Sequence, residues 1–554
     1  MSTPDAGLPA DLQARIAGWT AQDPDPGTRA QVEELVAAAA AGGRSAYAEL
    51  ADAFTGRLQF GTAGLRGALG PGPNRMNRVV VGQAAAGLAA YLLDAGAAGQ
   101  RVVVGYDARH RSDVFARDTA EILAAAGFEV LLTAAPTPTP VVAFGIGHFG
   151  CAAAVVVTAS HNPPQDNGYK VYLGDGSQIV PPADAEISAR IDDVARHALA
   201  EVPRSDGYTV VGNELAAAYV ARVAGLAPAG AARELSWVYT PLHGVGGSLV
   251  DRVVRAAGLP APAVVAAQAE PDPDFPTVPF PNPEEPGAID LAVAEARARG
   301  ADLVVANDPD ADRCAVATVV EGRWRMLSGD ELGALLGDDA LRRGVQGTYA
   351  CSVVSSSLLL RLAAAAGQPS RATLTGFKWI GRVPGLAFGY EEAIGYCVDP
   401  AAVPDKDGIS ALLRVLLLAA ALKAQGRTLA DRLDEIMTVH GVHATSQLSV
   451  RVADLGVISD AMARLRAQPP RELVGEPATV LDLADGTDEL PPTDAVMITS
   501  ELVKVVVRPS GTEPKLKCYL EVRRPPDAAV GAARSAAGAV LERLRAEMAE
   551  VLGL

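Results

Sequence analysis

The chain has 554 residues, of which 49% are hydrophobic and 20% are charged, and it contains 55 glycines and 39 prolines. This length exceeds what one hydrophobic core supports, so we expect about four domains in a globular protein rich in loops. The formal net charge of −17 argues against a nucleic-acid partner, because proteins that bind polyanions usually carry a basic face. A small anionic ligand remains compatible with a local cluster of basic residues.

The cysteines and the apolar stretches exclude further classes of protein. The five cysteines are scattered and show no metal-binding spacing, which is typical of small buried side chains in a reducing compartment. Residues 1–18 show no basic-then-apolar signal arrangement, and the most lipid-like stretch, 415–421, is far too short to cross a bilayer. We therefore expect a cytoplasmic protein with no membrane partner. The sequence does not identify an interface with another subunit.

Helical and strand patterns alternate along most of the chain. Ala-rich helical patterns in residues 1–55 lead into predicted strands at 101–106, 129–132 and 152–157, with a helix at 113–126. The strand pattern begins again at 235–239, 302–306 and 348–354. From about residue 445, strands alternate with Pro/Asp-rich loops before a long predicted helix at 527–552. This order predicts α/β domains followed by an α+β domain, with the boundaries 1–212, 213–324, 325–440 and 441–554.

Ser160 is the most informative polar residue. It lies in Thr158-Ala-Ser-His-Asn-Pro163 after the apolar run 152–157, so we expect an exposed hydroxyl at the carboxyl end of a strand. His161 follows directly, and Lys170 lies ten positions further on. A serine with these neighbours can act as a nucleophile that accepts phosphate. Acyl chemistry is disfavoured, because no Gly-x-Ser-x-Gly sequence surrounds the serine.

Three alternate aspartates follow the predicted strand 302–306, in the sequence Asp308-Pro-Asp-Ala-Asp312-Arg313. Their carboxylates can converge on one hard cation, and oxygen ligands with room for a phosphate oxygen suit Mg²⁺. An EF-hand loop is excluded, because Arg313 and Val319 stand where that loop needs glycine and glutamate. An acidic surface loop remains the alternative.

A local basic segment, Arg508-Pro-Ser-Gly-Thr-Glu-Pro-Lys515, follows a predicted strand at 503–507. The hydroxyls of Ser510 and Thr512 and the backbone around Gly511 can surround a phosphate, while Arg508 and Lys515 supply positive charge. A plain turn between two strands is the alternative.

Other motifs are weaker by themselves. The glycine-spaced loop 60–67 brings Arg66 near the backbone, and Gly389-Tyr-Glu-Glu-Ala-Ile-Gly395 carries paired carboxylates that can accept hydrogen bonds from sugar hydroxyls. Lys406 lies in Asp405-Lys-Asp-Gly408 at an expected helix start. Gly105-Tyr-Asp-Ala-Arg109 carries still less information. We interpret three histidines as structural or solvated, namely His243, His440 and His443.

Taken in this order, the motifs resemble the α-D-phosphohexomutase superfamily of phosphoglucomutases and phosphomannomutases, from about Gly56 to Glu521. Residues 60–67, Thr375-Gly-Phe-Lys-Trp-Ile-Gly381 and 390–395 are most similar to the branch with phosphoglucomutase-2 and phosphopentomutase type enzymes. The resemblance implies a heart-shaped, four-domain α/β architecture. In it, three similar α/β domains with mixed sheets precede a C-terminal α+β domain that closes over the cleft.

The resemblance also implies a role for each site residue. Ser160 would carry the transferred phosphate and, with Asp308, Asp310 and Asp312, would hold Mg²⁺. The transferring phosphoryl group would be surrounded by Arg66, His161, Lys170 and Arg313. The sugar and the non-reacting phosphate would be bound by Thr375, Gly376, Lys378, Glu391, Lys406, Arg508, Ser510, Gly511, Thr512 and Lys515.

The implied reaction interconverts a sugar 1-phosphate and 6-phosphate. Phospho-Ser160 would donate to a free sugar hydroxyl, and the resulting bisphosphate would turn round and return its other phosphate. Either Lys170 or His161 could take the hydroxyl proton. Glucose phosphate, with glucose 1,6-bisphosphate as activator, is the first candidate, and mannose phosphate is the next.

Ribose or deoxyribose 1-phosphate/5-phosphate is a third candidate for the substrate. Many hexose-specific relatives have Glu-x-Ser where this chain has Glu391-Glu-Ala393, so one partner for a sugar hydroxyl is missing. A Mg²⁺-dependent phosphosugar phosphatase is an alternative of a different class, because it would use the same ion and phosphate contacts.

Overall fold

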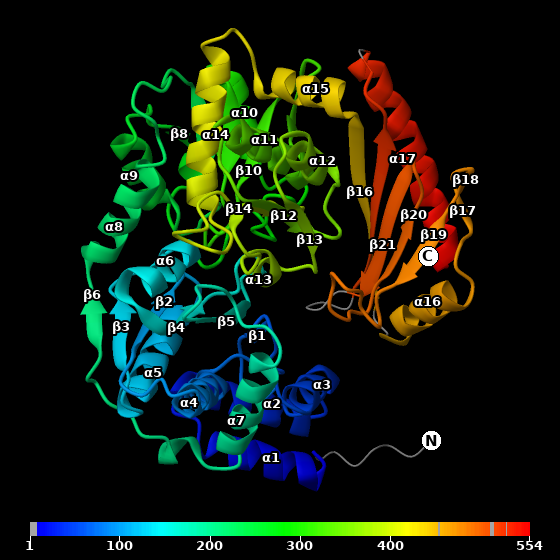
Figure 1. Ribbon diagram of the computed structural model, residues 1–554. Helices are drawn as coiled ribbons and strands as arrows, with labels where there is room; N and C mark the ends of the chain where they lie inside the picture. Colours follow the sequence, from blue (N-terminus) through cyan, green and yellow to red (C-terminus); the bar gives the residue numbers. More distant parts are fainter. Residues whose placement is uncertain (1–7, 453–454, 510–514, 528, 554) are drawn as a thin grey trace. The chain divides into compact units, whose positions relative to one another are not determined.

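The computed structural model describes residues 8–452, 455–509, 515–527 and 529–553. The chain forms two compact units. The first contains Met1–Ala227, Ser236–Cys314 and Ala401–Ile409, and the second contains Pro228–Leu235, Ala315–Pro400 and Ser410–Leu554. Helices and strands are labelled in Figure 1.

The first unit begins with three helices, α1 (Ala10–Thr20), α2 (Pro26–Ala40) and α3 (Arg44–Ala53). Asp25 caps α2, because its carboxylate accepts a 2.8 Å hydrogen bond from the Gly27 N–H and Pro26 needs no such partner. The rings of Trp19 and Phe54 pack edge to face at 5.8 Å. The apolar core of these helices includes Val79 and Leu199, so the predicted helical lead-in packs on the domain that follows.

A six-stranded mixed sheet, in the order β1-β5-β4-β2-β3-β6, follows the three helices. Strands β2, β3, β4 and β6 are parallel, and β5 runs antiparallel to β4 and β1. Valines alternate along β2, so Val102 and Val104 join the core beneath α4, α5 and α7 while Val103 faces Gly145 of α6. The strands are β1 (Leu65–Ala68), β2 (Arg101–Tyr106), β3 (Glu129–Thr133), β4 (Cys151–Val157), β5 (Asp166–Leu173) and β6 (Thr209–Val211). The helices are α4 (Arg78–Asp94), α5 (Ser112–Ala125), α6 (Thr139–Phe149) and α7 (Ala183–Val194), with a short 3₁₀ turn, η1 (Leu199–Glu201).

A second α/β region of the same unit carries the aspartate-rich loop. Its parallel strands β7 (Trp237–Thr240), β8 (Ala263–Val264) and β9 (Leu303–Ala306) lie in the order β9-β7-β8. Asn307 follows β9 and fixes the start of the loop, since its side chain accepts from the Tyr239 hydroxyl at 2.9 Å and donates to the Arg313 carbonyl at 2.6 Å. The helices are α8 (Asn213–Ala224), α9 (Gly247–Ala256), η2 (Ala266–Gln268) and α10 (Asp290–Arg299).

The second unit contains a hairpin, a four-stranded mixed sheet and a five-stranded antiparallel sheet. In the mixed sheet, β12 is parallel to β13 and β14, whereas β15 is antiparallel to β14. The strands are β10 (Ala315–Val320), β11 (Arg323–Met326), β12 (Thr348–Ser352), β13 (Ser370–Thr373), β14 (Leu386–Glu391) and β15 (Gly395–Cys397). The helices are α11 (Gly329–Arg342), α12 (Leu358–Ala365), α13 (Phe377–Ile380), α14 (Gly408–Lys423) and α15 (Leu429–His440). Strand β12 ends before the predicted residue 354, because Ser355 turns back and donates its N–H to the Ser352 carbonyl at 3.0 Å.

The antiparallel sheet has the order β16-β22-β21-β20-β19 and is followed by the long helix α17. This α+β arrangement begins close to the predicted change at residue 445. The elements are β16 (Val442–Arg451), α16 (Leu455–Ala467), β17 (Glu472–Leu473), β18 (Glu476–Pro477), β19 (Thr479–Asp482), β20 (Val496–Thr499), β21 (Val503–Pro509), β22 (Lys515–Arg524) and α17 (Val530–Leu552).

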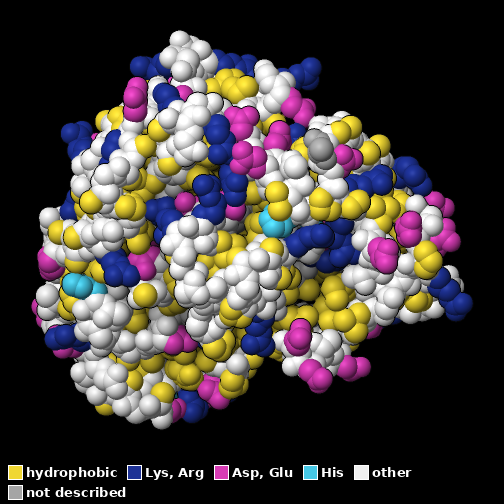
Figure 2. Space-filling model, turned by 45° about the horizontal axis from the view of Figure 1, so that its top comes forward, with side chains coloured by type: hydrophobic (Ala, Val, Ile, Leu, Met, Phe, Trp, Pro, Cys, Tyr) yellow, Lys and Arg dark blue, Asp and Glu magenta, His cyan; other side chains and the backbone are white. Residues whose placement is uncertain are grey.

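General features of the surface and core agree with the composition. All five cysteines are buried and free. Figure 2 shows acidic and basic side chains interspersed with hydrophobic ones over the face drawn. Within the described parts of the chain, none of the helices combines the length and hydrophobicity needed to span a bilayer.

Candidate functional site

Ser160 is the third residue after β4. Its backbone is strained, with a φ of 54°. Its N–H donates to the Thr158 hydroxyl at 2.8 Å, and its own hydroxyl donates to Asp308 Oδ2 at 2.8 Å. The ring nitrogen His161 Nδ1 lies 3.2 Å from Ser160 Oγ. Ser160 therefore lies at the end of a strand, as predicted. The predicted exposure is wrong, because the hydroxyl turns toward Asp308 and the residue is only 3% exposed.

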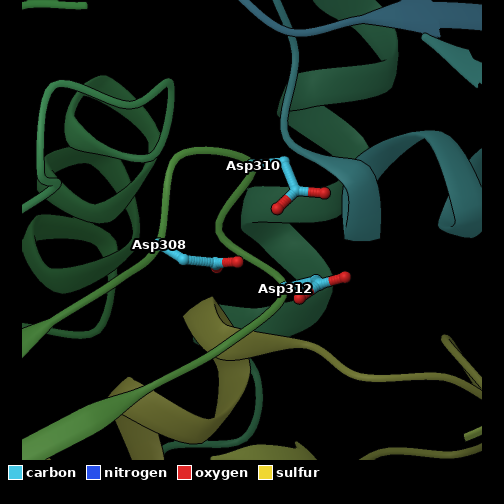
Figure 3. Close-up of side chains that lie close together, drawn as sticks. All are labelled: Asp308, Asp310 and Asp312. Atoms are coloured by element: carbon cyan, nitrogen blue, oxygen red, sulfur yellow. The ribbon is translucent and has the colours of Figure 1, made fainter. Parts of the chain in front are cut away.

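Three buried carboxylates converge in the loop after β9 (Figure 3). One ligand oxygen from each of Asp308, Asp310 and Asp312 lies within 4.8 Å of the other two. Helix α6 positions this loop, because the Thr139 N–H at its start donates to the Asp310 carbonyl at 3.0 Å and the Thr139 hydroxyl donates to Asp310 Oδ2 at 2.6 Å. The Arg313 N–H donates to Asp308 Oδ1 at 3.0 Å, which closes the loop on itself.

The protonation of the three aspartates is uneven. Burial and repulsion from Asp310 and Asp312 raise the pKa of Asp308 well above its usual range. Burial acts in the same direction on Asp312, but attraction to Lys170 and Lys406 outweighs it and holds the pKa of Asp312 below its usual range. A cation that shared all three carboxylates would remove this conflict, because it would favour the ionised form of each.

The oxygen atoms of this cluster fit a hard divalent cation. Among the described residues, Asp310 Oδ1 and Asp312 Oδ1 are buried and have no hydrogen-bond partner. Buried carboxylate oxygens are costly to leave unsatisfied, and oxygen ligands of this kind suit Mg²⁺. Asp308, Asp310 and Asp312 could therefore hold such an ion.

Cationic side chains surround the aspartates. Lys170 Nζ donates to Asp310 Oδ2 at 2.7 Å and to Asp312 Oδ2 at 2.9 Å. Burial lowers the pKa of Lys170, but the two carboxylates outweigh it, so the pKa lies above its usual range and the amine is charged. Lys406 Nζ lies 3.4 Å from Asp312 Oδ2. Its segment reaches the loop because Gly408 donates its N–H to the Ala311 carbonyl at 3.2 Å, where an added Cβ would lie 2.1 Å from the Arg313 carbonyl oxygen.

Arg66, His161 and Arg313 complete the same cluster. Arg66 donates to Asn162 Oδ1 at 3.2 Å, and its pKa is lowered by burial. Burial and the positive charges of Arg313 and Arg66 lower the pKa of His161 well below its usual range, so its imidazole is neutral. The structure thus brings together Ser160 and every predicted residue of the phosphoryl-transfer and metal groups, together with Lys406.

Arg109 supports the serine loop, a role that the motif Gly105-Tyr-Asp-Ala-Arg109 did not indicate. Its guanidinium donates to the backbone carbonyls of Ser160 at 2.7 Å, Pro163 at 2.8 Å and Asp166 at 3.2 Å, and to that of Asn162. The residue is 4% exposed, and its guanidinium lies 4.9 Å from the ring centre of Phe275. The available signal was an arginine in a loop after β2, the strand parallel to β4.

The predicted sugar and phosphate residues of the second unit lie on separate strands, turns and a short helix. Glu391 ends β14, Thr375 and Gly376 precede α13, and Lys378 lies within that helix. Arg508 is part of β21, and Lys515 begins β22, so both lie on strands and not in a loop after a strand. Ser510, Gly511 and Thr512 lie outside the described residues.

Tyr519 links two of these groups and was also missed. The pKa of Tyr519 is raised by burial and then by the negative charges of Glu392 and Glu391, whereas the positive charge of the nearby Arg508 acts in the opposite direction. The tyrosine therefore lies near both the paired glutamates and Arg508. His443 is buried and its Nδ1 lies 2.9 Å from Glu521 Oε1, in agreement with a structural role.

Comparison with known proteins gives four successive matches to one family. The descriptions "Phosphoglucomutase/phosphomannomutase, alpha/beta/alpha domain I", "domain II" and "domain III" match residues 57–197, 217–321 and 328–440, and the family's "C-terminal domain" matches residues 450–537. These matches confirm the predicted four-domain fold class.

Individual relatives span most of the chain. A "Probable phosphomannomutase" of Haemophilus influenzae is 49% identical over 455 residues, which cover 81% of this chain and 93% of that protein. A "Probable phosphoribomutase" of Schizosaccharomyces pombe is 36% identical and covers 92% of this chain and 94% of that protein. The crystal structure of a phosphoglucomutase/phosphomannomutase family protein from Burkholderia thailandensis matches with a TM-score of 0.68 at 22% identity. This match covers 89% of this chain and 97% of the other chain, and it shows only that the two proteins share a fold.

Proposed function

Because this chain belongs to the phosphoglucomutase/phosphomannomutase family of intramolecular phosphotransferases, we propose that it moves a phosphoryl group between two hydroxyls of a sugar phosphate through Ser160. The observation that carries this proposal is the 2.8 Å hydrogen bond from the Ser160 hydroxyl to Asp308, within the cluster of three aspartates and Lys170. A reactive oxygen beside carboxylates that could hold a divalent cation is what phosphoryl transfer requires.

The reaction consists of two transfers in opposite directions. In the first, the P–O bond of phospho-Ser160 breaks, a P–O bond to the free sugar hydroxyl forms, and the hydroxyl proton passes to a base in the site. In the second, the P–O bond between the sugar and its other phosphate breaks, a P–O bond to Ser160 Oγ forms, and the freed sugar oxygen takes up the proton from the base. Asp308, Asp310 and Asp312 would hold Mg²⁺, which supplies positive charge next to the transferring group.

The chain's own residues prepare this transfer. Arg109 holds the serine loop by its carbonyls, and Lys170 remains charged beside Asp310 and Asp312. Arg66 and Arg313 add positive charge near Ser160. Charge that is already in place costs no reorganisation when the negative charge of the phosphoryl group moves. Closure of the site around the substrate would exclude water and prevent hydrolysis of the phosphoserine.

We infer that the sugar is a pentose, with ribose 1-phosphate and ribose 5-phosphate as the pair interconverted. Ala393 lies in the turn between β14 and β15, directly after the two glutamates, and offers no hydroxyl to a hexose. The relative named a phosphoribomutase covers nearly the whole chain. Mannose phosphate is the second candidate, because the Haemophilus influenzae relative is more similar but covers less of the chain. Glucose phosphate stays a prediction from the sequence.

The sugar is tested by comparing kcat/KM for ribose 1-phosphate, deoxyribose 1-phosphate, mannose 1-phosphate and glucose 1-phosphate. Each assay contains Mg²⁺ and the corresponding bisphosphate. We expect ribose 1-phosphate to exceed both hexose phosphates by at least about tenfold, because a missing hydrogen-bond partner discriminates strongly between substrates. A higher value for mannose 1-phosphate would contradict the pentose but leave the mutase reaction intact.

The role of Ser160 is tested with Ser160→Ala. We expect isomerisation to be lost while sugar-phosphate binding, measured by calorimetry, is largely kept. Ser535→Ala is the matched control, since that serine is exposed on α17 and its hydroxyl only donates to the Gly531 carbonyl at 2.9 Å. Retained turnover in Ser160→Ala would contradict the proposal. Release of inorganic phosphate in place of isomerisation by the unaltered protein would favour the phosphatase.

A further inference from the structure

The two adjacent glutamates of the turn after β14 have different surroundings. Glu391 is the last residue of β14. Glu392 Oε2 accepts hydrogen bonds from the Ser352 hydroxyl at 3.0 Å and from the Ser355 hydroxyl at 3.2 Å. The Glu392 N–H donates to Ser355 Oγ at 3.1 Å. The backbone and the side chain of Glu392 therefore both bind the loop that follows β12. The Glu392 carboxylate is thereby bound to other residues of the protein.

The loop that Glu392 binds is itself attached to the C-terminal sheet. Lys504 Nζ, on β21, donates to the Ser355 carbonyl at 2.5 Å. Ser356 and Ser357 donate their hydroxyls to Glu521 on β22 at 2.8 Å and 3.0 Å. A series of short hydrogen bonds thus runs from the turn with Glu391, through the serine loop, to two neighbouring strands of the antiparallel sheet.

One of these strands also carries a predicted phosphate ligand. Lys504 and Arg508 are four residues apart on β21, and side chains an even number of positions apart point to the same face of a strand. Arg508 in turn lies near Tyr519, which lies near Glu391 and Glu392. The distance between Glu391 and Arg508 therefore depends on contacts at both ends of this series. At one end, Glu392 binds the turn that carries Glu391 to the loop after β12. At the other end, Lys504 binds that loop to β21, the strand that carries Arg508.

We propose that Glu392 is a positioning residue, which binds the Ser352 and Ser355 hydroxyls and thereby holds Glu391 at a fixed place relative to Arg508. The inference rests on the proposed function, in which Glu391 contacts the sugar and Arg508 the phosphate that does not react. One substrate molecule can contact both only if the turn and the strand keep their separation. An error of about 1 Å in such an arrangement is enough to weaken binding and catalysis.

The proposal has a consequence for pH dependence. Burial, followed by the charges of Glu391 and Asp330, raises the pKa of Glu392 to about 7. The titratable groups that face it are Glu391 on the same turn, Asp330 on α11, Cys351 on β12 and Tyr519 on β22. An ionised carboxylate accepts both serine hydroxyls, whereas a protonated one loses acceptor capacity. We therefore expect KM to fall as the pH rises through about 7.

The test uses Glu392→Ala and Glu392→Gln in the full-length protein, with KM and kcat measured across neutral pH. Glu392→Ala removes the acceptor, so we expect KM for the sugar phosphate to rise about tenfold with kcat changed much less. The carboxamide oxygen in Glu392→Gln still accepts hydroxyls but does not titrate. We expect near-normal KM in this variant without the fall near pH 7.

Controls separate this effect from other titrations and from unfolding. The phosphate of the substrate also titrates near pH 6, but it does so equally with every variant. Glu435→Gln removes an exposed glutamate and should keep the unaltered pH profile. If Glu392→Ala unfolds, Ser355→Ala removes one hydroxyl only, and we expect KM to rise about threefold.

Two results would overturn the proposal, namely an unchanged KM in the folded Glu392→Ala and Ser355→Ala variants, or an unaltered KM–pH profile in Glu392→Gln. Failure of the proposed function appears differently, as no isomerisation of any sugar phosphate by the unaltered protein. In that case, calorimetric binding of ribose 5-phosphate to the unaltered protein and to Glu392→Ala decides the positioning role. Equal dissociation constants would then exclude it.

Discussion

The Ser160 hydroxyl donates a 2.8 Å hydrogen bond to Asp308 Oδ2, although the two residues are 148 positions apart in the chain. Ser160 follows β4 and Asp308 follows β9, so each stands beyond the carboxyl end of a parallel strand. This is the edge at which α/β sheets place their ligands. Because both groups are buried, a change in either one alters the charge balance around the other.

Asp308→Asn keeps the size of the side chain and removes its charge. We expect Mg²⁺ at 100 times its dissociation constant to stabilise the unaltered protein by about 2.7 kcal/mol. In Asp308→Asn this stabilisation should be largely lost, together with turnover, because one of three ligands no longer carries charge. Calorimetric unfolding in the presence of Mg²⁺ and in the presence of a chelator measures the stabilisation by the ion. Asp251→Asn, at an exposed aspartate paired with Arg255, is the control, and equal stabilisation of Asp308→Asn would contradict the metal site.

Arg109→Lys tests the support of the serine loop. A lysine ammonium cannot reproduce the planar fork that binds four carbonyls, so we expect a loss of about 2 kcal/mol in the free energy of unfolding and of about tenfold or more in kcat/KM. Urea denaturation and steady-state kinetics measure the two effects. Arg101→Lys serves as control, because its ion pair with Glu129 is exposed and should change stability by no more than about 0.5 kcal/mol. Equal effects of the two substitutions would argue against the role of Arg109.

Gly64→Ala should disrupt the strand that carries Arg66. Gly64 has a φ of +73°, and an added Cβ would lie 1.8 Å from the Tyr169 carbonyl oxygen. We expect a loss of more than about 3 kcal/mol in stability, because the clash is with backbone of β5. Gly56→Ala is matched in conformation, with a φ of +71° and no atom within 4 Å, so it should cost only about 1 kcal/mol. Thermal denaturation compares them, and similar losses would refute the packing explanation.

Glu521→Gln tests the buried ion pair of the second unit. Burial raises the pKa of Glu521, but Lys504 and the hydrogen bond from His443 outweigh it, so the pKa lies below its usual range. A carboxyl with a lowered pKa stabilises the folded state above its unfolded pKa of about 4.3, and this contribution is lost as the pH falls below that value.

At neutral pH we expect Glu521→Gln to lower the free energy of unfolding by about 3 kcal/mol, because Lys504 and His443 lose their buried partner. Below about pH 4 the difference between the variant and the unaltered protein should shrink progressively, because Glu521 is then protonated in the unfolded chain but still ionised in the folded one. Urea denaturation as a function of pH measures both. Glu435→Gln removes the charge of an exposed glutamate that pairs with Arg427 and Arg432, and it should cost less than about 1 kcal/mol. A constant difference at all pH values would rule out the charge as the cause.

The chemistry of the site was largely readable from local motifs. The strand before Ser160, the strand before Asp308 and the alternation of the three aspartates were each visible in short segments, because hydrophobic runs and loop composition are local properties. Arg109 was not readable in this way. Its partners are backbone carbonyls of a loop more than fifty residues away, and carbonyl groups leave no trace in side-chain composition.

The paired glutamates show the same difference. The sequence showed two adjacent carboxylates, and only the family resemblance selected Glu391 for the sugar, whereas the structure gives Glu392 a role by turning it toward Ser352 and Ser355. Adjacent residues at the end of a strand point in opposite directions, and which of them faces the protein depends on the neighbouring loop. Exposure of Ser160 was predicted wrongly for a related reason, since the covering Asp308 lies in a different α/β region.

By itself the sequence determined the succession of strands and helices, the residue types of the phosphoryl-transfer site and the resemblance to one family, because these depend on neighbours along the chain. Only the tertiary structure decided which polar groups are buried, which of two similar side chains binds the protein, and how the pKa values of the aspartates diverge. Burial and charge interaction depend on distances between atoms far apart in sequence, and those distances exist only after the chain has folded.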